Sequence, residues 1–570
     1  MIKSKSLPLI AYSVLTIIWL YTFYVSVLAP PFFGYFTVDE NFVADSGVFL
    51  WYGNTPRCLD WPATPSVLIF FVMFGVMIVY QTLSGLGEVN QVLDLFEGID
   101  RVAYGYISSR QELLLAGRTI QLIIVGVVMW LFIRFLFQKQ HSLLNDTSRM
   151  VLTVLILTSY ILWFNAPVLR PEAISGSIFM YLLARLLFSD TLRVRDSYFL
   201  AVLFGIILAE RLLFVFIAPL VLAGIYFKTE THQIRYTFRF LILTVIVFIL
   251  LCPFLITDPL VILKSFFGGI MAKMQDKPMA TFFNMEFIGS YFQNPINILI
   301  SFVTLAGAWV LIKEKRYFHY ILVGNWILFL FLVLRSAKIY DTHVLPAGII
   351  TLFTAGLGIA YLANLSGNKR FLLAGAILIP IASMNLYEYF RFQERSHTDS
   401  NMVKAYYWIN TLPEDSRLLV HPELEFYLPK SRKTLAWDLE QNQDSVKMVR
   451  KLNYLMGNKG DKAIDEASLP YIARSFAFED ERLYEIQFQL LNKYNSKSTQ
   501  KKFTYHVYLD NTELASTSVK TDEAIRDFRE GKYDYMITDM RLEGLEPVKV
   551  FANGVHADTF IYRTDQNNSR

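Results

Sequence analysis

The sequence predicts an α-helical membrane protein with many spans, followed by a smaller α/β domain outside the lipid. Of its 570 residues, 54% are hydrophobic and only 18% are charged, whereas a soluble chain carries about 25% charged residues. Apolar runs of about 18 residues or more, enough to cross a bilayer, recur through the first 390 residues and then stop. These observations exclude a cytosolic enzyme.

The charge argues against a nucleic-acid-binding protein, and the cysteine content argues against a protein built on disulfides or on a cysteine-based metal site. The formal net charge is +4, and no group of Lys and Arg residues is interleaved with aromatic ones, so no nucleic-acid partner is expected. The two cysteines, Cys58 and Cys252, are too few for a disulfide framework or a cysteine-based metal site.

The first span is predicted to remain in the mature protein. Lys3 and Lys5 precede an apolar run over residues 7–29. A signal peptide would have a shorter apolar core of about 7–15 residues and a small-residue cleavage site. This run is longer and ends in Ala29-Pro30-Pro31, which favours an uncleaved membrane helix.

The positions of Lys and Arg in short loops orient the later spans. Further apolar runs lie near residues 119–137, 150–168, 173–188, 198–227, 236–256, 291–312, 318–334, 344–363 and 371–389. The basic residues that mark the cytoplasmic side are Lys139, Arg149, Arg193, Arg195, Lys228, Arg235, Lys313, Lys315, Arg316, Lys369 and Arg370, together with Lys3 and Lys5. For these loops to share one side, residues 198–227 must form a hairpin with Glu210 and Arg211 at its far tip.

This arrangement predicts about eleven spans, with the N-terminus in the cytoplasm and the C-terminus outside. A transmembrane domain then covers residues 1–389, and residues 30–118 form its first outer loop. Within this loop, the apolar run 67–83 is interpreted as a re-entrant or interfacial helix.

Residues 390–570 are predicted to form a soluble α/β domain. Strand-like runs at 417–421, 503–509, 533–538 and 559–562 alternate with helical ones at 402–411, 480–493 and 522–530. This alternation is typical of a small α/β fold, and no catalytic motif stands out in it.

Polar residues beside membrane segments cost free energy unless they are paired or used, and here they gather on the predicted outer side. They are Asp39 and Glu40 after the first span; Asp60 in the stretch Asp60-Trp61-Pro62-Ala63-Thr64-Pro65; Arg170 and Glu172, on either side of Pro171; Glu210 and Arg211; and Arg335, Lys338, Tyr340, Asp341 and His343. Glu172 has Arg170 as a possible partner, and Glu210 has Arg211, so both a structural and a chemical role are open for these pairs.

The arrangement resembles the polytopic GT-C type glycosyltransferases that use polyprenyl-phosphate sugars, the group of the protein O-mannosyltransferases and the lipid A aminoarabinose transferases. Their first outer loop opens with an Asp-Glu pair, here Asp39-Glu40, and continues to an Asp/Lys-x-Pro-Pro-Leu-like element. Asp60-Trp61-Pro62-Ala63-Thr64-Pro65 stands in that place with its prolines separated. Weaker likenesses are Pro171-Glu172, the hairpin from Gly205 to Arg211, and Lys338-Ile339-Tyr340 through Pro346.

The resemblance implies transfer of a sugar from a polyprenyl-phosphate carrier to an envelope glycan, lipid or protein. Such a reaction needs a base for the acceptor hydroxyl and cations for the phosphate. The expected catalytic residues are Asp39 as base, Glu40 in support, and Glu172. The expected substrate-binding residues are Asp60, Arg170, Arg211, Lys338, Tyr340 and His343, with Arg211 and Lys338 on the phosphate.

Two other functions stay open at this point. One is an envelope polysaccharide polymerase or ligase that uses a diphosphate-linked glycan, and the other is a lipid or solute transporter, for which inverted repeats would be expected. No cofactor is required by the predicted reaction, although Asp39, Glu40 and Glu172 offer oxygen ligands for a divalent cation. The expected location is a bacterial inner membrane.

Overall fold

The computed structural model describes two compact units. Its described residues are 6–28, 43, 47, 63–83, 110–229, 232–253, 283–335, 341–397, 401–413, 416–420, 507–509, 512–515, 526, 528–539, 541–542, 544–552 and 558–564. One unit comprises Met1–Tyr24, Asp60–Ser66 and Thr119–Arg391, and the other comprises Val25–Leu59, Val67–Arg118 and Phe392–Arg570.

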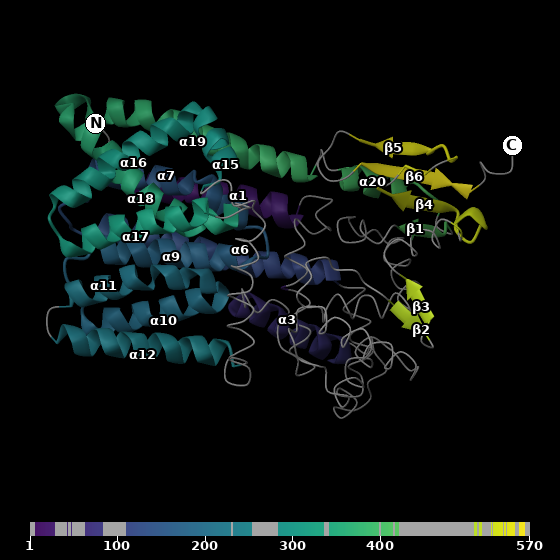
Figure 1. Cartoon of the computed structure of the whole chain (residues 1–570), viewed down its shortest axis with the longest axis horizontal. Coiled ribbons are helices and arrows are strands. Elements are labelled where there is room, and N and C mark those ends of the chain that lie inside the picture. The colour runs from purple at the N-terminus through teal and green to yellow at the C-terminus, as the bar shows by residue number, and fades with distance from the viewer. Residues whose placement is uncertain are drawn as a thin grey trace. The chain divides into compact units, whose positions relative to one another are not determined.

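The membrane part is built of helices (Figure 1). They are α1 (Ser6–Phe23), η1 (Tyr24–Leu28), α3 (Thr64–Leu83), α6 (Arg110–Gln138), α7 (Asp146–Leu157), α8 (Tyr160–Asn165), α9 (Pro171–Phe188), α10 (Val194–Glu210), η2 (Leu212–Ile217), α11 (Ala218–Lys228), α12 (Gln233–Leu251), α15 (Met285–Gln293), α16 (Pro295–Lys313), α17 (Tyr317–Leu334), α18 (Asp341–Leu365), η3 (Gly367–Lys369) and α19 (Arg370–His397). Among the described residues, nine helical segments are long and apolar enough to cross a membrane. The prediction of an α-helical membrane protein is therefore confirmed, whereas the count of eleven spans stays a prediction.

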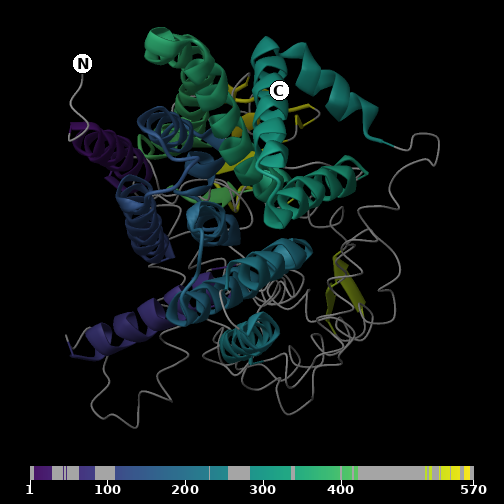
Figure 2. The same ribbon diagram turned by 90° about the vertical axis from the view of Figure 1, so that its left-hand side faces the viewer.

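Helix α9 lies at the centre of this bundle and packs against α10, α11 and α18 (Figure 2). It starts with Pro171 in its first turn, carries Glu172 there and has Arg185 in its last turn. This order favours a helix, because the fixed φ angle of proline is that of a first helical turn. The helix dipole also stabilises an acidic residue at the N-terminal end and a basic residue at the C-terminal end. Outer helices such as α12 instead expose large apolar side chains, among them Ile234 and Leu250, as lipid contact requires.

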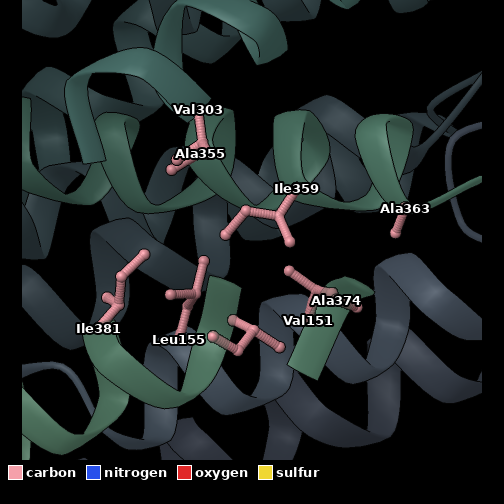
Figure 3. Packing of buried hydrophobic residues seen from close by; sticks show 9 residues of the cluster. Val151, Leu155, Val303, Ala355, Ile359, Ala363, Ala374 and Ile381 are labelled. Atoms are coloured by element: carbon pink, nitrogen blue, oxygen red, sulfur yellow. The ribbon is translucent and has the colours of Figure 1, made fainter. Parts of the chain in front are cut away.

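Helices α16 and α18 cross at very short range. A Cβ atom added at Gly307 of α16 would lie 1.7 Å from the carbonyl oxygen of Thr354, and one at Gly358 of α18 would lie 1.9 Å from that of Val303. Small residues allow two backbones to approach in this way. The apolar cluster next to this crossing joins α7, α16, α18 and α19 through Val151, Leu155, Val303, Ala355, Ile359, Ala363, Ala374, Leu378 and Ile381 (Figure 3).

Loops that the sequence assigns to the cytoplasm meet at one end of the bundle. Asp190, after α9, accepts a hydrogen bond of 2.8 Å from Arg316, which lies between α16 and α17. Its Oδ1 also lies 3.3 Å from Nε2 of His141, in the loop after α6. Lys228 at the end of α11 donates to the carbonyl oxygen of Ser189 at 2.6 Å. The loops that were assigned to one side because they contain Lys and Arg therefore also lie together in space.

Residues 194–228 form the predicted helical hairpin. Helix α10 ends at Glu210, Arg211 has extended backbone angles, and the chain returns through η2 and α11. The two feet of the hairpin meet, since the backbone N–H of Leu192 donates to the carbonyl oxygen of Lys228 at 2.8 Å. Gly205 in α10 lets α12 approach, because a Cβ there would lie 2.8 Å from Val247.

The C-terminal part of the other unit contains a mixed four-stranded sheet, a separate two-stranded sheet of β2 and β3, and a helix. Its elements are α20 (Asn401–Ile409), β1 (Leu418–Val420), β2 (Val507–Leu509), β3 (Thr512–Ala515), β4 (Tyr535–Thr538), β5 (Lys549–Phe551) and β6 (Thr559–Arg563). The larger sheet has the order β1-β4-β6-β5, with β1 parallel to β4 and the other pairs antiparallel. Strands β1, β2, β4 and β6 fall in the four predicted strand regions, β6 running one residue further to Arg563, whereas β3 and β5 were not predicted. The predicted helix at 480–493 lies outside the described residues.

Two apolar clusters stabilise this sheet. One joins Ala405 and Ile409 of α20 to Ile537 of β4 and Ile561 of β6. The other includes Met536 and Tyr562 from the same two strands. Neighbouring residues of a strand point to opposite faces, so the sheet is covered on both sides.

Candidate functional site

The structure describes three of the predicted site residues together with their side chains, namely Arg170, Glu172 and Arg211. Asp39, Glu40, Asp60, Lys338 and Tyr340 lie outside the described residues. His343 belongs to helix α18, but its side chain also lies outside them. The described part of the site therefore consists of the first turn of α9 and the tip of the hairpin.

Glu172 and Arg211 form a buried ion pair. Oε1 of Glu172 contacts Nη1 of Arg211, and the two residues are only 3% and 8% exposed. The sequence offered Arg170 as the partner of Glu172 and Glu210 as the partner of Arg211, but the structure joins Glu172 to Arg211. Arg170 is the residue directly before α9 and is half-buried.

The backbone explains why Arg211 reaches α9. Its N–H still donates to the carbonyl oxygen of Ile207 at 2.9 Å, as in a helix, but its φ of −144° and ψ of 107° end the helix there. The next residues form the tight turn η2, whose Phe214 donates its N–H to the carbonyl oxygen of Arg211 at 3.1 Å. The guanidinium group of Arg211 therefore projects from the tip of the hairpin.

Arg211 keeps hydrogen-bonding capacity beyond this ion pair. A guanidinium group carries five N–H donors, and Nη1 is the nitrogen that contacts Glu172. Its Nε is buried and has no hydrogen-bond partner among the described residues. A second anion that binds here would contact the guanidinium group of Arg211, whose position the ion pair with Glu172 already fixes.

Glu210 lies beside Arg211 in the chain but makes different contacts. It is fully buried, and its two carboxyl oxygens lie 2.9 and 3.1 Å from the hydroxyl of Ser66, which donates to them. Its backbone oxygen accepts a hydrogen bond from the N–H of Ala63 at 3.0 Å. The hairpin tip thus binds the segment Ala63–Ser66, which comprises the end of the proline stretch noted in the sequence and the residue after it.

Thr64 and Cys252 extend this contact. The hydroxyl of Thr64 lies 3.0 Å from Sγ of Cys252, directly after the end of α12. Both residues are buried. Thr64 belongs to the proline stretch noted in the sequence, but no motif pointed to Ser66 or Cys252, because each lies far along the chain from its partner.

The described part of the chain contains no group of three or more His, Cys, Asp and Glu residues that could hold a metal ion. Near the hairpin tip it brings together the carboxyl groups of Glu172 and Glu210 and the guanidinium group of Arg211. These groups can orient a polar substrate and bind an anion. Two of the three acidic residues proposed as shared ligands, Asp39 and Glu40, lie outside the described residues.

The other end of the bundle has a different electrostatic character. The hydrogen bond from Arg316 holds the pKa of Asp190 below its usual range. Burial lowers the pKa of His141 to about 4, so this imidazole is neutral at pH 7 and forms no ion pair with Asp190 there. Helix α9 has 18 residues, and at about 1.5 Å per residue its length of about 27 Å separates this end from Glu172.

No protein-family model matches the chain, and comparison with curated proteins finds no significant match.

Proposed function

We propose that this protein is a membrane glycosyltransferase that moves a sugar from a polyprenyl-phosphate carrier to an acceptor at the outer face of the membrane, most simply a bacterial inner membrane. The observation that carries the proposal is the buried pair of Glu172 and Arg211 at the end of the bundle opposite the basic loops. By the charge rule, this end faces outward. A phosphate on a lipid carrier would contact the guanidinium group of Arg211 at this end.

The proposed reaction needs few groups from the protein. An acceptor hydroxyl attacks the anomeric carbon of the sugar, the bond from that carbon to the phosphate oxygen breaks, and the phosphate leaves on its lipid. The proton of the hydroxyl passes to a base, for which we propose Asp39 with Glu40 in support. The leaving group is already a stabilised anion, so a separate general acid is not required.

Arg211 and Lys338 are the proposed phosphate ligands. Arg211 has N–H donors beyond its contact with Glu172, and a guanidinium can bind phosphate through two parallel hydrogen bonds. In this proposal Glu172 holds the guanidinium in place. Asp60, Arg170, Tyr340 and His343 complete the proposed substrate contacts.

Replacing Arg211 by Lys is expected to raise the apparent KM for the lipid donor by about 10-fold or more, because one charged hydrogen bond of the fork is lost. Lysine keeps a cation opposite Glu172, so the variant should fold. The measurement is sugar transfer in membranes, with donor and acceptor concentrations varied separately. The KM for the acceptor should stay unchanged.

Arg185 supplies the matched control for this experiment. It also lies in α9 and pairs with a carboxylate, Asp196, at 2.7 Å, but it does so near the basic end of the bundle. Arg185→Lys is expected to leave the donor KM unchanged. A folded Arg211→Lys protein with the donor KM and turnover of wild type would show that Arg211 is structural.

The proposal also predicts that the C-terminal sheet lies outside the cytoplasm. Single cysteines replacing the exposed Lys549 in β5 and the exposed Lys313 at the end of α16 test this in a Cys58→Ser background, in which Cys252 is buried. In spheroplasts, an impermeant thiol reagent should label the first cysteine but reach the second only after the membrane is permeabilised. The reverse pattern would place the proposed site on the cytoplasmic side and contradict the proposal.

A further inference from the structure

We infer that Glu210 is a positioning residue, which fastens the segment Ala63–Ser66 to the hairpin tip and so holds this part of the first outer loop next to Arg211. The part of this inference that concerns catalysis rests on the proposed function. The fastening itself rests on the contacts of Glu210 and is testable without any enzyme assay.

Glu210 contacts the segment through both its backbone and its side chain. The carbonyl oxygen accepts from the N–H of Ala63 at 3.0 Å, and the carboxyl group accepts from the hydroxyl of Ser66 at 2.9 and 3.1 Å. The bond between Ser66 and Glu210 links residues 144 positions apart in the chain. Two bonds of different kinds from one residue fix both the place and the orientation of the segment.

The burial of Glu210 shows that this contact is specific. A carboxyl group at an open hairpin tip would remain in water, because burying it is unfavourable unless it is hydrogen-bonded. Glu210 is instead fully buried, and the cation next to it in the chain, Arg211, contacts Glu172. Ser66 thus provides the side-chain hydrogen bond that makes the burial of Glu210 tolerable.

The conformation of Ala63 indicates that contacts between distant residues hold this segment. Its φ is +46°, in the left-handed region that residues with a Cβ atom adopt rarely. Such a backbone persists when surrounding contacts determine it. Here the N–H of Ala63 is bound by Glu210, so loss of the Glu210 contacts should release the segment.

Cys252 supplies a direct reporter of this fastening. Its thiol lies 3.0 Å from the hydroxyl of Thr64 and is fully buried. If the segment leaves the hairpin tip, Thr64 leaves Cys252 with it. The reaction of this thiol with a membrane-permeant maleimide therefore measures how often the segment is released.

The experiment uses the full chain in native membranes with Cys58 replaced by Ser, so that Cys252 is the remaining thiol. Glu210→Ala and Ser66→Ala should each raise the rate of labelling by N-ethylmaleimide about tenfold, since losing a buried hydrogen-bond partner shifts a local opening equilibrium by roughly that factor. Glu210→Gln and Ser66→Thr keep an acceptor and a donor, respectively, and should stay near the wild-type rate.

Ser197→Ala is the matched control. Ser197 is fully buried in the first turn of α10, and its hydroxyl donates to the carbonyl oxygen of Val194 at 2.7 Å. This change removes a comparable hydrogen bond at the other end of the same helix and should leave the labelling rate unchanged. A folded Glu210→Ala protein that is labelled no faster than this control would overturn the inference.

The proposed role of Glu210 in the reaction is tested separately, by measuring turnover. Turnover of the lipid donor should fall in Glu210→Ala and be rescued in Glu210→Gln, in parallel with the labelling rates. Faster labelling with unchanged turnover would overturn the positioning role. If the wild-type protein transfers no sugar, the proposed function fails, while the labelling rates still decide whether Glu210 fastens the segment.

Discussion

Gly307→Ala is expected to destabilise the protein severely, by about 3 kcal/mol or more, at the upper end of the cost of overpacking. The added methyl group would lie 1.7 Å from the carbonyl oxygen of Thr354 in α18. That oxygen belongs to the backbone of a packed helix and cannot move away as a flexible side chain would. Gly358→Ala, with its Cβ 1.9 Å from the carbonyl oxygen of Val303, should have the same effect.

The measurement is the yield and thermal unfolding of the detergent-purified protein, and α17 offers a matched control. Gly324 also lies inside an apolar helix, and a Cβ there meets no atom within 4 Å. Gly324→Ala should be neutral or slightly stabilising, because alanine favours a helix over glycine by roughly 1 kcal/mol. Equal stability of the two variants would contradict the close crossing of α16 and α18.

Asp39→Asn is expected to lower the turnover of sugar transfer by about 10²- to 10⁴-fold, the usual cost of losing a general base. Asparagine is close to aspartate in size but cannot accept the proton of the acceptor hydroxyl. The assay is transfer from the lipid donor in membranes, with the amount of folded protein measured in parallel.

Glu40→Gln is the control for this prediction, because Glu40 is the neighbouring carboxylate to which we assign a supporting role. It should reduce turnover less than Asp39→Asn. Turnover close to wild type in Asp39→Asn would exclude Asp39 as the base, and a large loss in Glu40→Gln alone would transfer the role to Glu40.

Much of the helical architecture follows from the sequence alone. Hydropathy over about 18 residues identifies a spanning helix without any knowledge of its neighbours. The charge rule likewise needs no knowledge of tertiary contacts, and it predicted the hairpin of residues 198–227 even though Glu210 and Arg211 interrupt the apolar run. In the C-terminal part, short runs rich in β-branched and aromatic residues indicated the strand regions, because this signal also lies in neighbouring residues of the chain.

The partners of the buried charges depended on the tertiary structure. From the sequence, Glu172 could pair with Arg170 and Glu210 with Arg211, because nearness in the chain is the information that a sequence provides. The structure pairs Glu172 with Arg211 and Glu210 with Ser66. Neighbouring residues at a helix end point in different directions, and the helices packed around them decide which group each one meets.

The same reason applies to the backbone crossing at Gly307 and Gly358. Glycine is common in membrane helices, and the sequence does not distinguish these two from Gly324, which has open space around it. Hydropathy and charge determine which segments are helices and which of their ends lie together. The rotation and contact distance of each helix result from packing against the others, and this packing determines which side chains form the candidate site.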